Sequence, residues 1–277
     1  MSKFKWSLAF AITLLLQTMV YSLKIAKPSP QPGNHTSVDL VAEADTVQPG
    51  HSLRVGVLFK LEPGWHIYWQ NPGDSGEPPR IEWKLPAGFS AGAIDWPVPT
   101  RMGKPPIIDY GYENQVLLIA LVRVPGKLRV GQNVVIAARA KWLVCREICV
   151  PEQAELVLNL PVRPATERQP GKSHFLFEQT IKHLPKALPA GWSVRATSAK
   201  DSFVLTLQCP ARISGLSFIP LEPDQIENSA PQKMEPSDHG ARLTLAKSEQ
   251  LLKSVTSLRG VVVVEGWAAY SVIVPVK

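Results

Sequence analysis

The stretch Lys141–Glu152 reads KWLVCREICVPE and holds two of the three cysteines in the 277-residue sequence. An apolar run that begins at Val134 leads into this stretch, and a second apolar run that ends at Leu160 leads out of it. Apolar runs on both sides of a short polar segment predict two β-strands joined by a tight turn. Cys145 and Cys149 would then lie on the turn.

The spacing of Cys145 and Cys149 limits what the pair can do. Disulfides usually have Cα atoms about 4.4–6.8 Å apart, whereas four steps of extended chain span about 13 Å, so the chain must fold back for the two cysteines to pair. The ring so formed is small and removes little entropy from the unfolded chain, so the disulfide would stabilise the fold only weakly. Arg146 would favour a nearby thiolate and Glu147 would oppose it. The spacing alone leaves open both an exchange-active disulfide and a structural hairpin disulfide.

The composition indicates a globular protein with many short strands. Hydrophobic residues make up 45% of the chain and charged residues 19%, which suits a protein with a buried core. Many of the 26 prolines stand between apolar runs, and this punctuation favours short strands over long helices. The net charge of +7 is spread along the chain without a basic run, so nucleic-acid binding is not predicted.

Residues 1–22 are predicted to be a secretory signal peptide. Two lysines precede an apolar segment, Leu8–Val20, and the residues that follow suit cleavage after Ser22. The apolar segment is short for a membrane span, which needs about 20 residues. Residues 23–35, with their prolines and lysines, are expected to form a flexible lead-in. The mature protein is therefore expected in an oxidising compartment, where a cysteine pair can form a disulfide.

Residues 36–162 are predicted to form an antiparallel β-sandwich of immunoglobulin type. Apolar residues recur at every second position in several segments, and no convincing helix interrupts them. A long irregular segment, Thr100–Asn114, is expected between two of about eight strands. The clearest predicted strands are Val38–Ala42, Leu53–Leu61, a short strand around Ile81 and Trp83, Gln115–Val124, and Asn133–Val144.

A second antiparallel β-sandwich is predicted in residues 173–277, after a linker at residues 163–172. This part begins with one short helix, Ser173–Leu184, and the segment Leu221–Gly240 is expected to be a polar loop. Cys209 stands alone at a strand end, where an unpaired cysteine is most often a small buried hydrophobe, and it is not expected to join the disulfide. The predicted fold class is all-β, with two immunoglobulin-like sandwiches in tandem after a signal peptide.

Four motifs occur in the same order as in a known family. They are GWHIYW at residues 64–69, WPVP at 96–99, YGY at 110–112, and the stretch from WLVC to CVPE at 142–152. Together they resemble the N-terminal periplasmic domain of the thiol:disulfide interchange protein DsbD. The sequence is most similar to relatives of the ScsB (suppressor of copper sensitivity) type, in which a second β domain follows the first.

The resemblance implies thiol–disulfide exchange in the periplasm. In this family the N-terminal domain takes electrons from a membrane-embedded thiol relay and passes them to periplasmic thioredoxin-like proteins, and no small-molecule cofactor is expected. Cys145 and Cys149 would be the catalytic pair, in which Cys149 forms the mixed disulfide with the partner and Cys145 resolves it. The family's membrane segment and thioredoxin domain have no counterpart in these 277 residues, so a separate membrane-embedded electron donor is expected. Whether the chain is an enzyme by itself stays open.

The resemblance also implies a segment that shields the cysteines. In the family an aromatic-bearing loop covers the pair until a partner displaces it. Thr100–Tyr112 is the candidate for this cap because it is long and rich in Pro and Gly. Tyr110 and Tyr112 are the candidate shielding residues, and Tyr68 is a third. The alternative is that the segment simply connects two strands.

Two other functions compete with the exchange hypothesis. One is a non-enzymatic binding or scaffold module in which the disulfide is structural. The other is a copper-binding module in which the two thiolates act with His66 or Met102, since soft ligands suit Cu(I). No cluster of His, Met and Cys stands at ligand spacing in the sequence, so no metal site is predicted.

Overall fold

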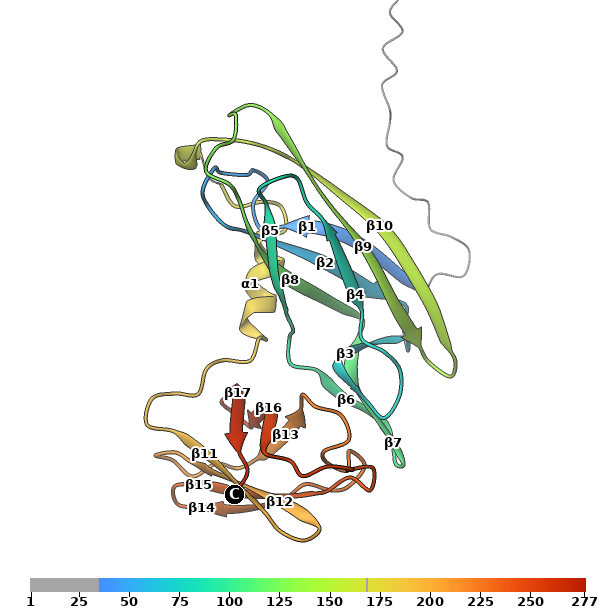
Figure 1. Ribbon diagram of the computed structural model, residues 1–277, viewed down its shortest axis with the longest axis vertical. Helices are drawn as coiled ribbons and strands as arrows, with labels where there is room; N and C mark the ends of the chain where they lie inside the picture. Colours follow the sequence, from blue (N-terminus) through green and yellow to red (C-terminus); the bar gives the residue numbers. More distant parts are fainter. Residues whose placement is uncertain (1–34, 168) are drawn as a thin grey trace, which may run out of the picture. The chain divides into compact units, whose positions relative to one another are not determined.

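The computed structural model describes residues 35–167 and 169–277. The predicted signal peptide and all but the last residue of the predicted lead-in lie outside the described residues. The described chain is all-β, with many antiparallel strands, one α-helix and one short 3₁₀ helix, as the sequence predicts (Figure 1). Neither of these helices is long and apolar enough to cross a membrane.

The strands of residues 36–161 form two antiparallel sheets. One sheet has the order β1-β2-β8-β5, and the other has the order β10-β9-β3-β7-β6 with β4 paired to β9. One cluster of buried side chains, drawn from the strands of both sheets, forms the core of this part, which is therefore an antiparallel β-sandwich. The strands are β1 (Thr36–Ala42), β2 (Leu53–Leu61), β3 (His66–Gly73), β4 (Arg80–Lys84), β5 (Ser90–Asp95), β6 (Thr100–Lys104), β7 (Ile107–Glu113), β8 (Gln115–Arg123), β9 (Asn133–Cys145) and β10 (Cys149–Pro161).

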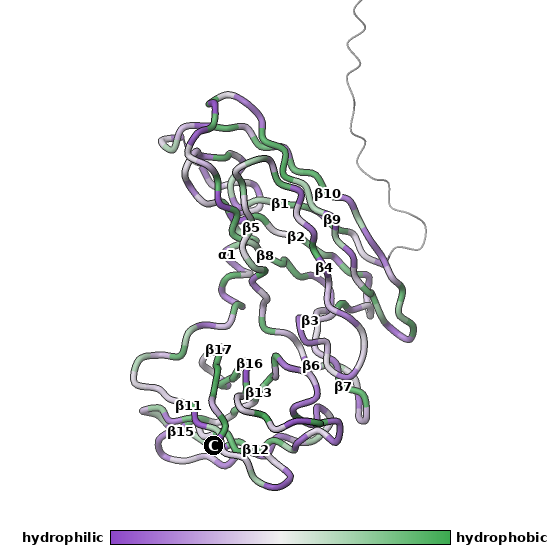
Figure 2. Tube along the Cα trace, in the orientation of Figure 1, coloured by the Kyte–Doolittle hydropathy of each residue, from purple (hydrophilic) through white to green (hydrophobic). Residues whose placement is uncertain are grey.

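The burial of β9 explains why its residues form a strand. From Val134 to Val144 every second side chain is buried, and the side chains between them are exposed or partly exposed. An apolar residue at every second position gives a strand one face for the core and one for solvent. Figure 2 shows this mixture of hydrophobic and hydrophilic residues along β9 and β10, and a more continuous hydrophobic run along β8.

Two segments of this sandwich differ from the sequence prediction. The prediction of an irregular segment at Thr100–Asn114 is wrong, because most of these residues form the antiparallel hairpin β6–β7. Five consecutive residues of β7, Ile108–Tyr112, are buried, so the strand has no apolar–polar alternation that a sequence could reveal. The second segment is β3, for which no strand is predicted. It begins within the GWHIYW motif, and Ile67–Trp69 are all buried, so again no alternation marks the strand.

The strands after residue 190 form two smaller antiparallel sheets, with the orders β11-β12-β15-β14 and β13-β16-β17, around a second cluster of buried side chains. The prediction of a loop throughout Leu221–Gly240 is wrong at β14, an almost fully exposed strand whose sequence carries no apolar period. Cys209 is 5% exposed, and its thiol donates to the carbonyl oxygen of Ala211 at 3.0 Å. The strands are β11 (Ser193–Ser198), β12 (Ser202–Gln208), β13 (Leu216–Pro220), β14 (Lys233–Ser237), β15 (Gly240–Ala246), β16 (Ser257–Val264) and β17 (Ala268–Pro275).

The one α-helix of the described chain, α1 (His174–Lys182), falls within the predicted helix Ser173–Leu184. A 3₁₀ helix, η1 (Ala165–Glu167), precedes it in the predicted linker. Phe177 of α1 is fully buried in a small cluster with Leu58 of β2 and Leu117 of β8. The apolar face of α1 therefore packs on the first sandwich, although the predicted boundary at residue 172 groups this helix with the second.

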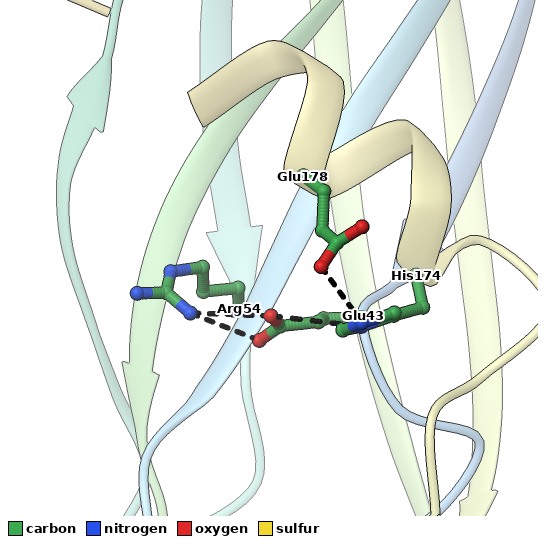
Figure 3. Close-up of polar contacts among 4 residues, drawn as sticks. All are labelled: Glu43, Arg54, His174 and Glu178. Atoms are coloured by element: carbon green, nitrogen blue, oxygen red, sulfur yellow. Dashed lines mark hydrogen bonds and ion pairs between the residues drawn. The ribbon is translucent and has the colours of Figure 1, made fainter. Parts of the chain in front are cut away.

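Polar contacts at the start of α1 reinforce this packing (Figure 3). Arg54 donates from one guanidinium nitrogen to both carboxylate oxygens of Glu43, at 3.2 and 3.1 Å. The ring of His174 lies 3.9 Å from Glu43 and 3.4 Å from Glu178. Glu43 is buried, but Arg54 and His174 are partly exposed and Glu178 is exposed. Ion pairs with exposed partners contribute at most about 1 kcal/mol each, so the burial of Phe177 is the larger contribution.

Candidate functional site

The cysteine pair closes the end of a long hairpin. Strands β9 and β10 are paired along their whole length, from Asn133 opposite Pro161 to Cys145 opposite Cys149 (Figure 1). Three residues, Arg146–Ile148, make the turn, and the Arg146 N–H donates to the carbonyl oxygen of Ile148 at 3.1 Å. Cys145 and Cys149 form a disulfide, with their Cα atoms 4.1 Å apart. The chain therefore folds back between the cysteines, as their spacing requires.

The two halves of the disulfide differ in exposure. Cys145 is 3% exposed and ends the buried part of β9. Cys149 is exposed, as are the three residues of the turn. Ile148, immediately before Cys149, has 68% of its surface exposed. A reactant from solution therefore meets Cys149 first.

The site lies on the face of the sheet that points away from the core. His66 of β3 stands opposite Cys145 of β9, and Tyr68 stands opposite Gly111 of β7. Cross-strand partners share a face, as do residues two apart along a strand. Cys145, His66 and Tyr68 therefore share one face, whereas their neighbour Ile67 belongs to the core cluster on the other face.

Tyr68 connects this face to the disulfide. Its hydroxyl lies 3.6 Å from the sulfur of Cys149, and the sulfur of a disulfide has no proton, so the hydroxyl is the donor. Its ring is 1% exposed and meets the ring of His66 edge to face, at 5.2 Å between centroids. Burial raises the pKa of Tyr68, and the phenol therefore stays protonated at neutral pH.

A short segment, Asp74–Gly76, covers the ring of Tyr68, and we call it the cover loop. Gly76 has φ +75°, and a Cβ built on it would lie 2.1 Å from a ring carbon of Tyr68, so only glycine fits against the ring. The N–H and the hydroxyl of Ser75 each donate to the carboxylate of Asp109 at 2.9 Å. Asp74 accepts a bond from the backbone N–H of Ile108 at 2.8 Å. Strand β7 thus fixes the loop over Tyr68.

Tyr110 and Tyr112 point away from the cysteines. Both belong to the core cluster, on the opposite face of the sheet from His66 and Tyr68. The hydroxyl of Tyr112 donates to the carbonyl oxygen of Pro97 at 2.7 Å, and that of Tyr110 donates to the side chain of Asn228 at 3.1 Å. Of the three tyrosines proposed from the sequence, the structure brings Tyr68 to the disulfide and leaves the other two in the core.

The turn of the hairpin is held against an aromatic stack. The guanidinium carbon of Arg146 lies 5.2 Å from the centroid of the Trp65 ring. Trp65 stacks in turn on His35, with 3.6 Å between the ring centroids. A guanidinium over an indole face gains about 0.5–1 kcal/mol at an exposed site. This contact keeps a positive charge beside the cysteine pair, which favours a thiolate there when the disulfide is open.

His66, a titratable ring, stands opposite Cys145 in the sheet. Burial lowers its pKa, although the carboxylates of Asp109 and Glu113 oppose the shift, so the ring is neutral at neutral pH. Its Nε2 atom is buried and has no hydrogen-bond partner among the described residues. The sequence offered no sign of this environment, because the pairing of β3 with β9 joins segments far apart in the chain.

An open hollow of about 450 Å³ lies along the same hairpin. Leu143 and Pro151, which face each other two residues before Cys145 and two after Cys149, are part of its wall. Glu77 and Arg80, which follow the cover loop, supply charged groups. The disulfide thus stands beside a surface that combines apolar and charged side chains. Within the described part of the chain, no three His, Cys, Asp or Glu side chains are grouped to hold a metal ion.

Comparison with known proteins gives a family match and a similar fold. Residues 37–161 match the model of the family described as thiol:disulfide interchange protein DsbD, N-terminal. The N-terminal periplasmic domain of ScsB from Proteus mirabilis is 18% identical in sequence to this chain. The match covers 89% of this chain and 96% of that one, with a TM-score of 0.65. The fold of the described chain is therefore that of the ScsB domain.

Two further solved structures are much less similar. A protein of unknown function from Porphyromonas gingivalis is 8% identical, with a TM-score of 0.25 over 88% of this chain and 100% of that chain. The E. coli chaperone DraB is 13% identical, with a TM-score of 0.18 over 86% of this chain and 97% of that chain. Neither score supports a shared fold. No curated protein matches the chain.

Proposed function

Because residues 37–161 form a domain of the DsbD N-terminal family, we propose that the protein is a thiol–disulfide exchange module that passes electrons to thioredoxin-like partners. Cys145 and Cys149 carry the exchange. The observation that supports this most strongly is the position of the disulfide, at the tip of a hairpin with Cys149 exposed and Cys145 buried. A disulfide that exchanges with a partner needs one sulfur that the partner's sulfur can reach.

A purely structural role explains this disulfide less well. The two strands are already joined by continuous pairing over the full length of β9 and β10. The disulfide adds a link only at the last pair and closes a ring of four residue steps. Cross-links that close such short loops remove little entropy from the unfolded chain. The bond therefore contributes little to the fold, whereas it stands where exchange can occur.

The different exposures of the two sulfurs support a different role for each. In the reduced protein the thiolate of Cys149 attacks one sulfur of the partner's disulfide, forms a mixed disulfide and releases the partner's other sulfur as a thiolate. Cys145 then attacks the sulfur of Cys149, which reforms the Cys145–Cys149 bond and releases the partner's remaining sulfur. Two electrons pass to the partner, which leaves as a dithiol once its thiolates are protonated. The step needs no small-molecule cofactor, since the cysteines carry the electrons.

Two features around the disulfide fit a regulated encounter. Tyr68 and the cover loop limit access to Cys149 from the outer face of the sheet. The hollow beside Leu143 and Pro151 gives a partner's backbone and side chains a place to dock next to that sulfur. A partner that enters the hollow can displace the cover loop and bring its own disulfide to Cys149.

The proposed compartment is the periplasm. The leader predicted in residues 1–22 would direct the chain there, and the solved ScsB domain that shares its fold is described as periplasmic. An oxidising compartment would close the Cys145–Cys149 disulfide by default. A separate membrane-embedded thiol relay would then be the electron donor that reopens it.

A redox titration of the purified protein tests the proposal. The protein is equilibrated with thiol–disulfide buffers of different potential, and the free thiols are labelled and counted by mass. A structural disulfide lies below about −300 mV, whereas a disulfide that exchanges with partners lies higher. A potential above that limit supports the proposal. A pair that stays oxidised under strongly reducing conditions would show a structural role instead.

A further inference from the structure

We propose that His66 is the general base that takes the proton from the thiol of Cys145 when Cys145 resolves the mixed disulfide. This inference rests on the proposed exchange function and adds to it the group that activates the buried cysteine. The residue pair is defined by the sheet, in which His66 of β3 and Cys145 of β9 stand directly opposite each other. Such a pair has Cβ atoms about 4.5–5.5 Å apart on one face.

The buried cysteine needs such a base. Cys145 is 3% exposed, so water has little access to its thiol. A thiol in buried surroundings gives up its proton reluctantly, and only the thiolate attacks a disulfide. Cys149 has solvent and the Tyr68 hydroxyl beside it. The resolving step is therefore the one that depends on a proton acceptor supplied by the protein.

The ring of His66 has an unused atom in the oxidised protein. Its Nε2 is buried and has no hydrogen-bond partner within the described residues. Buried polar atoms nearly always have a partner, so an exception is a mark of strain or function. In the disulfide Cys145 has no proton to share. When the bond opens, the Cys145 sulfur becomes a thiol that must move away from Cys149, and it can donate to this nitrogen.

The charged groups around His66 keep the ring ready to accept a proton. Asp109 and Glu113 of β7 are the carboxylates that act on it, and the uncharged ring of Tyr68 on its own strand meets it edge to face. Across the sheet on β9 it faces Cys145. Burial outweighs the carboxylates and lowers the pKa of His66, so the neutral ring has a free lone pair at neutral pH. The carboxylates stabilise the cationic ring once the proton has moved.

The step balances in atoms and charge. In the tautomer that carries its proton on Nδ1, the ring of His66 accepts the proton of the Cys145 thiol at Nε2, and the thiolate so formed attacks the sulfur of Cys149. The bond between Cys149 and the partner breaks as the Cys145–Cys149 bond forms, and the partner's sulfur leaves with the electron pair. His66 then gives its proton to that leaving thiolate or to water, and the ring is neutral again.

Stopped-flow mixing of the reduced full-length protein with dithiobis(nitrobenzoic acid), a coloured aromatic disulfide, separates the two steps. The first thionitrobenzoate is released as Cys149 attacks, at a rate that depends on the probe concentration. The second is released as Cys145 attacks, at a rate that does not. We expect His66→Gln to leave the first phase unchanged and to slow the second about 100-fold, the lower end of the contribution of a positioned general base.

The pH profile separates a base from a merely structural residue. In the natural protein the rate of the second phase should be low only in acid, where His66 is protonated, and should not change with pH near neutrality. In His66→Gln it should rise steadily toward alkaline pH, because only ionisation of the thiol by solvent remains. The matched control is His51→Gln, an exposed histidine in the turn before β2, which should behave as the natural protein.

The outcomes distinguish this inference from the function on which it rests. If the natural protein shows no second phase, the cysteines do not exchange as a pair and the proposed function fails. If the natural protein shows both phases and His66→Gln keeps the rate and the pH profile of the second, the base is not His66. Equal slowing of both phases would also overturn the inference, because it would show a structural effect.

A measurement on the natural protein covers the case in which His66→Gln does not fold. The histidine ring signals are followed by NMR through a pH titration of the oxidised and of the reduced protein. The titration of His66 should shift on reduction, because its Nε2 gains the Cys145 thiol as a partner. A His66 titration that is the same in both states would overturn the inference.

Discussion

The hydroxyl of Tyr68 lies 3.6 Å from the sulfur of Cys149 and joins the cover loop to the exposed half of the disulfide. Behind Tyr68 stand Gly76, which packs on its ring, and Ser75, which is bonded to Asp109 on β7. If the cover loop is displaced, the side chain of Tyr68 can move with it, and the contact of its hydroxyl with Cys149 changes. This arrangement would link access to the site with the chemistry of the sulfur that we propose to react.

Replacement of Tyr68 by Phe should slow the first step of exchange. The phenol, whose pKa is raised by burial, stays protonated and can donate to the Cys149 thiolate of the reduced protein. A hydrogen bond to a charged group contributes about 1.5–3 kcal/mol, so its loss should lower the rate of Cys149 attack by about tenfold or more. The release of the first thionitrobenzoate measures this rate. Tyr110→Phe is the control, since its hydroxyl bonds to Asn228, and a rate that falls equally in both variants would contradict the prediction.

A methyl group at Gly76 should disturb the cover loop. Gly76→Ala places a Cβ 2.1 Å from a ring carbon of Tyr68 at φ +75°, whereas Gly131→Ala has φ +88° but meets nothing within 4 Å. Both variants carry the cost of a positive φ, about 1 kcal/mol, but only the first also displaces the ring. We expect Gly76→Ala to lose at least about 1 kcal/mol more of the free energy of unfolding.

Alkylation of the reduced protein checks the same variant for access to the site. In Gly76→Ala the displaced ring should leave Cys149 more open, so its thiol should react faster with iodoacetamide than in Gly131→Ala. Urea unfolding gives the stability, and mass spectrometry gives the rate at Cys149. Equal stability and equal alkylation rates in the two variants would show that Gly76 does not hold the cover over the site.

The hairpin of the cysteine pair could be predicted from the sequence because the signals for it lie in its own residues. Apolar side chains alternate along β9, and the ring formed by Cys145 and Cys149 requires the chain to turn between them. The helix near residue 180 was predictable for a similar reason, since Phe177 and Ile181 share one face. Each of these signals lies within a few residues of the feature that it predicts.

The surroundings of the disulfide could not be predicted, because they depend on contacts between distant segments. Ser75 and Asp109 are 34 residues apart, and Tyr68 and Cys149 are 81 apart. The face on which Tyr110 lies was also hidden, since Ile108–Tyr112 are all buried and no alternation marks the core side. Once β7 is paired with β3, the register places Tyr110 on the core face of the sheet and Tyr68 on the face that carries the site.

Tyr110 should make the protein sensitive to alkaline pH. Burial raises the pKa of Tyr110 to about 12, with Arg101 lowering it and Asp74 raising it to a smaller extent. A group whose pKa is raised on folding contributes stability that is complete below its unfolded pKa of about 10 and is lost as the pH rises toward 12. Between about pH 9 and pH 11 this loss should be about 1.4 kcal/mol.

Urea unfolding of the natural protein and of Tyr110→Phe at the two pH values checks this prediction. The variant lacks the phenol. Between the two pH values its free energy of unfolding should therefore fall by about 1.4 kcal/mol less than that of the natural protein. At the lower pH it should be about 1 kcal/mol less stable, because it loses the bond to Asn228. If the free energy of unfolding depends on pH in the same way in the natural protein and in Tyr110→Phe, the Tyr110 hydroxyl is not the cause of the loss of stability at alkaline pH.

The most direct test of the exchange function is a trapping experiment with single-cysteine proteins. Cys145→Ser and Cys149→Ser are each made in a Cys209→Ser background, so that one site thiol remains, and each reduced protein is exposed to thioredoxin-like partners in periplasmic extract. The account predicts that Cys145→Ser accumulates mixed disulfides that dithiothreitol releases, because the exposed Cys149 can attack and nothing resolves the product. Cys149→Ser should trap little, because Cys145 is 3% exposed. Trapping by Cys149→Ser alone, or by neither variant, would contradict the account.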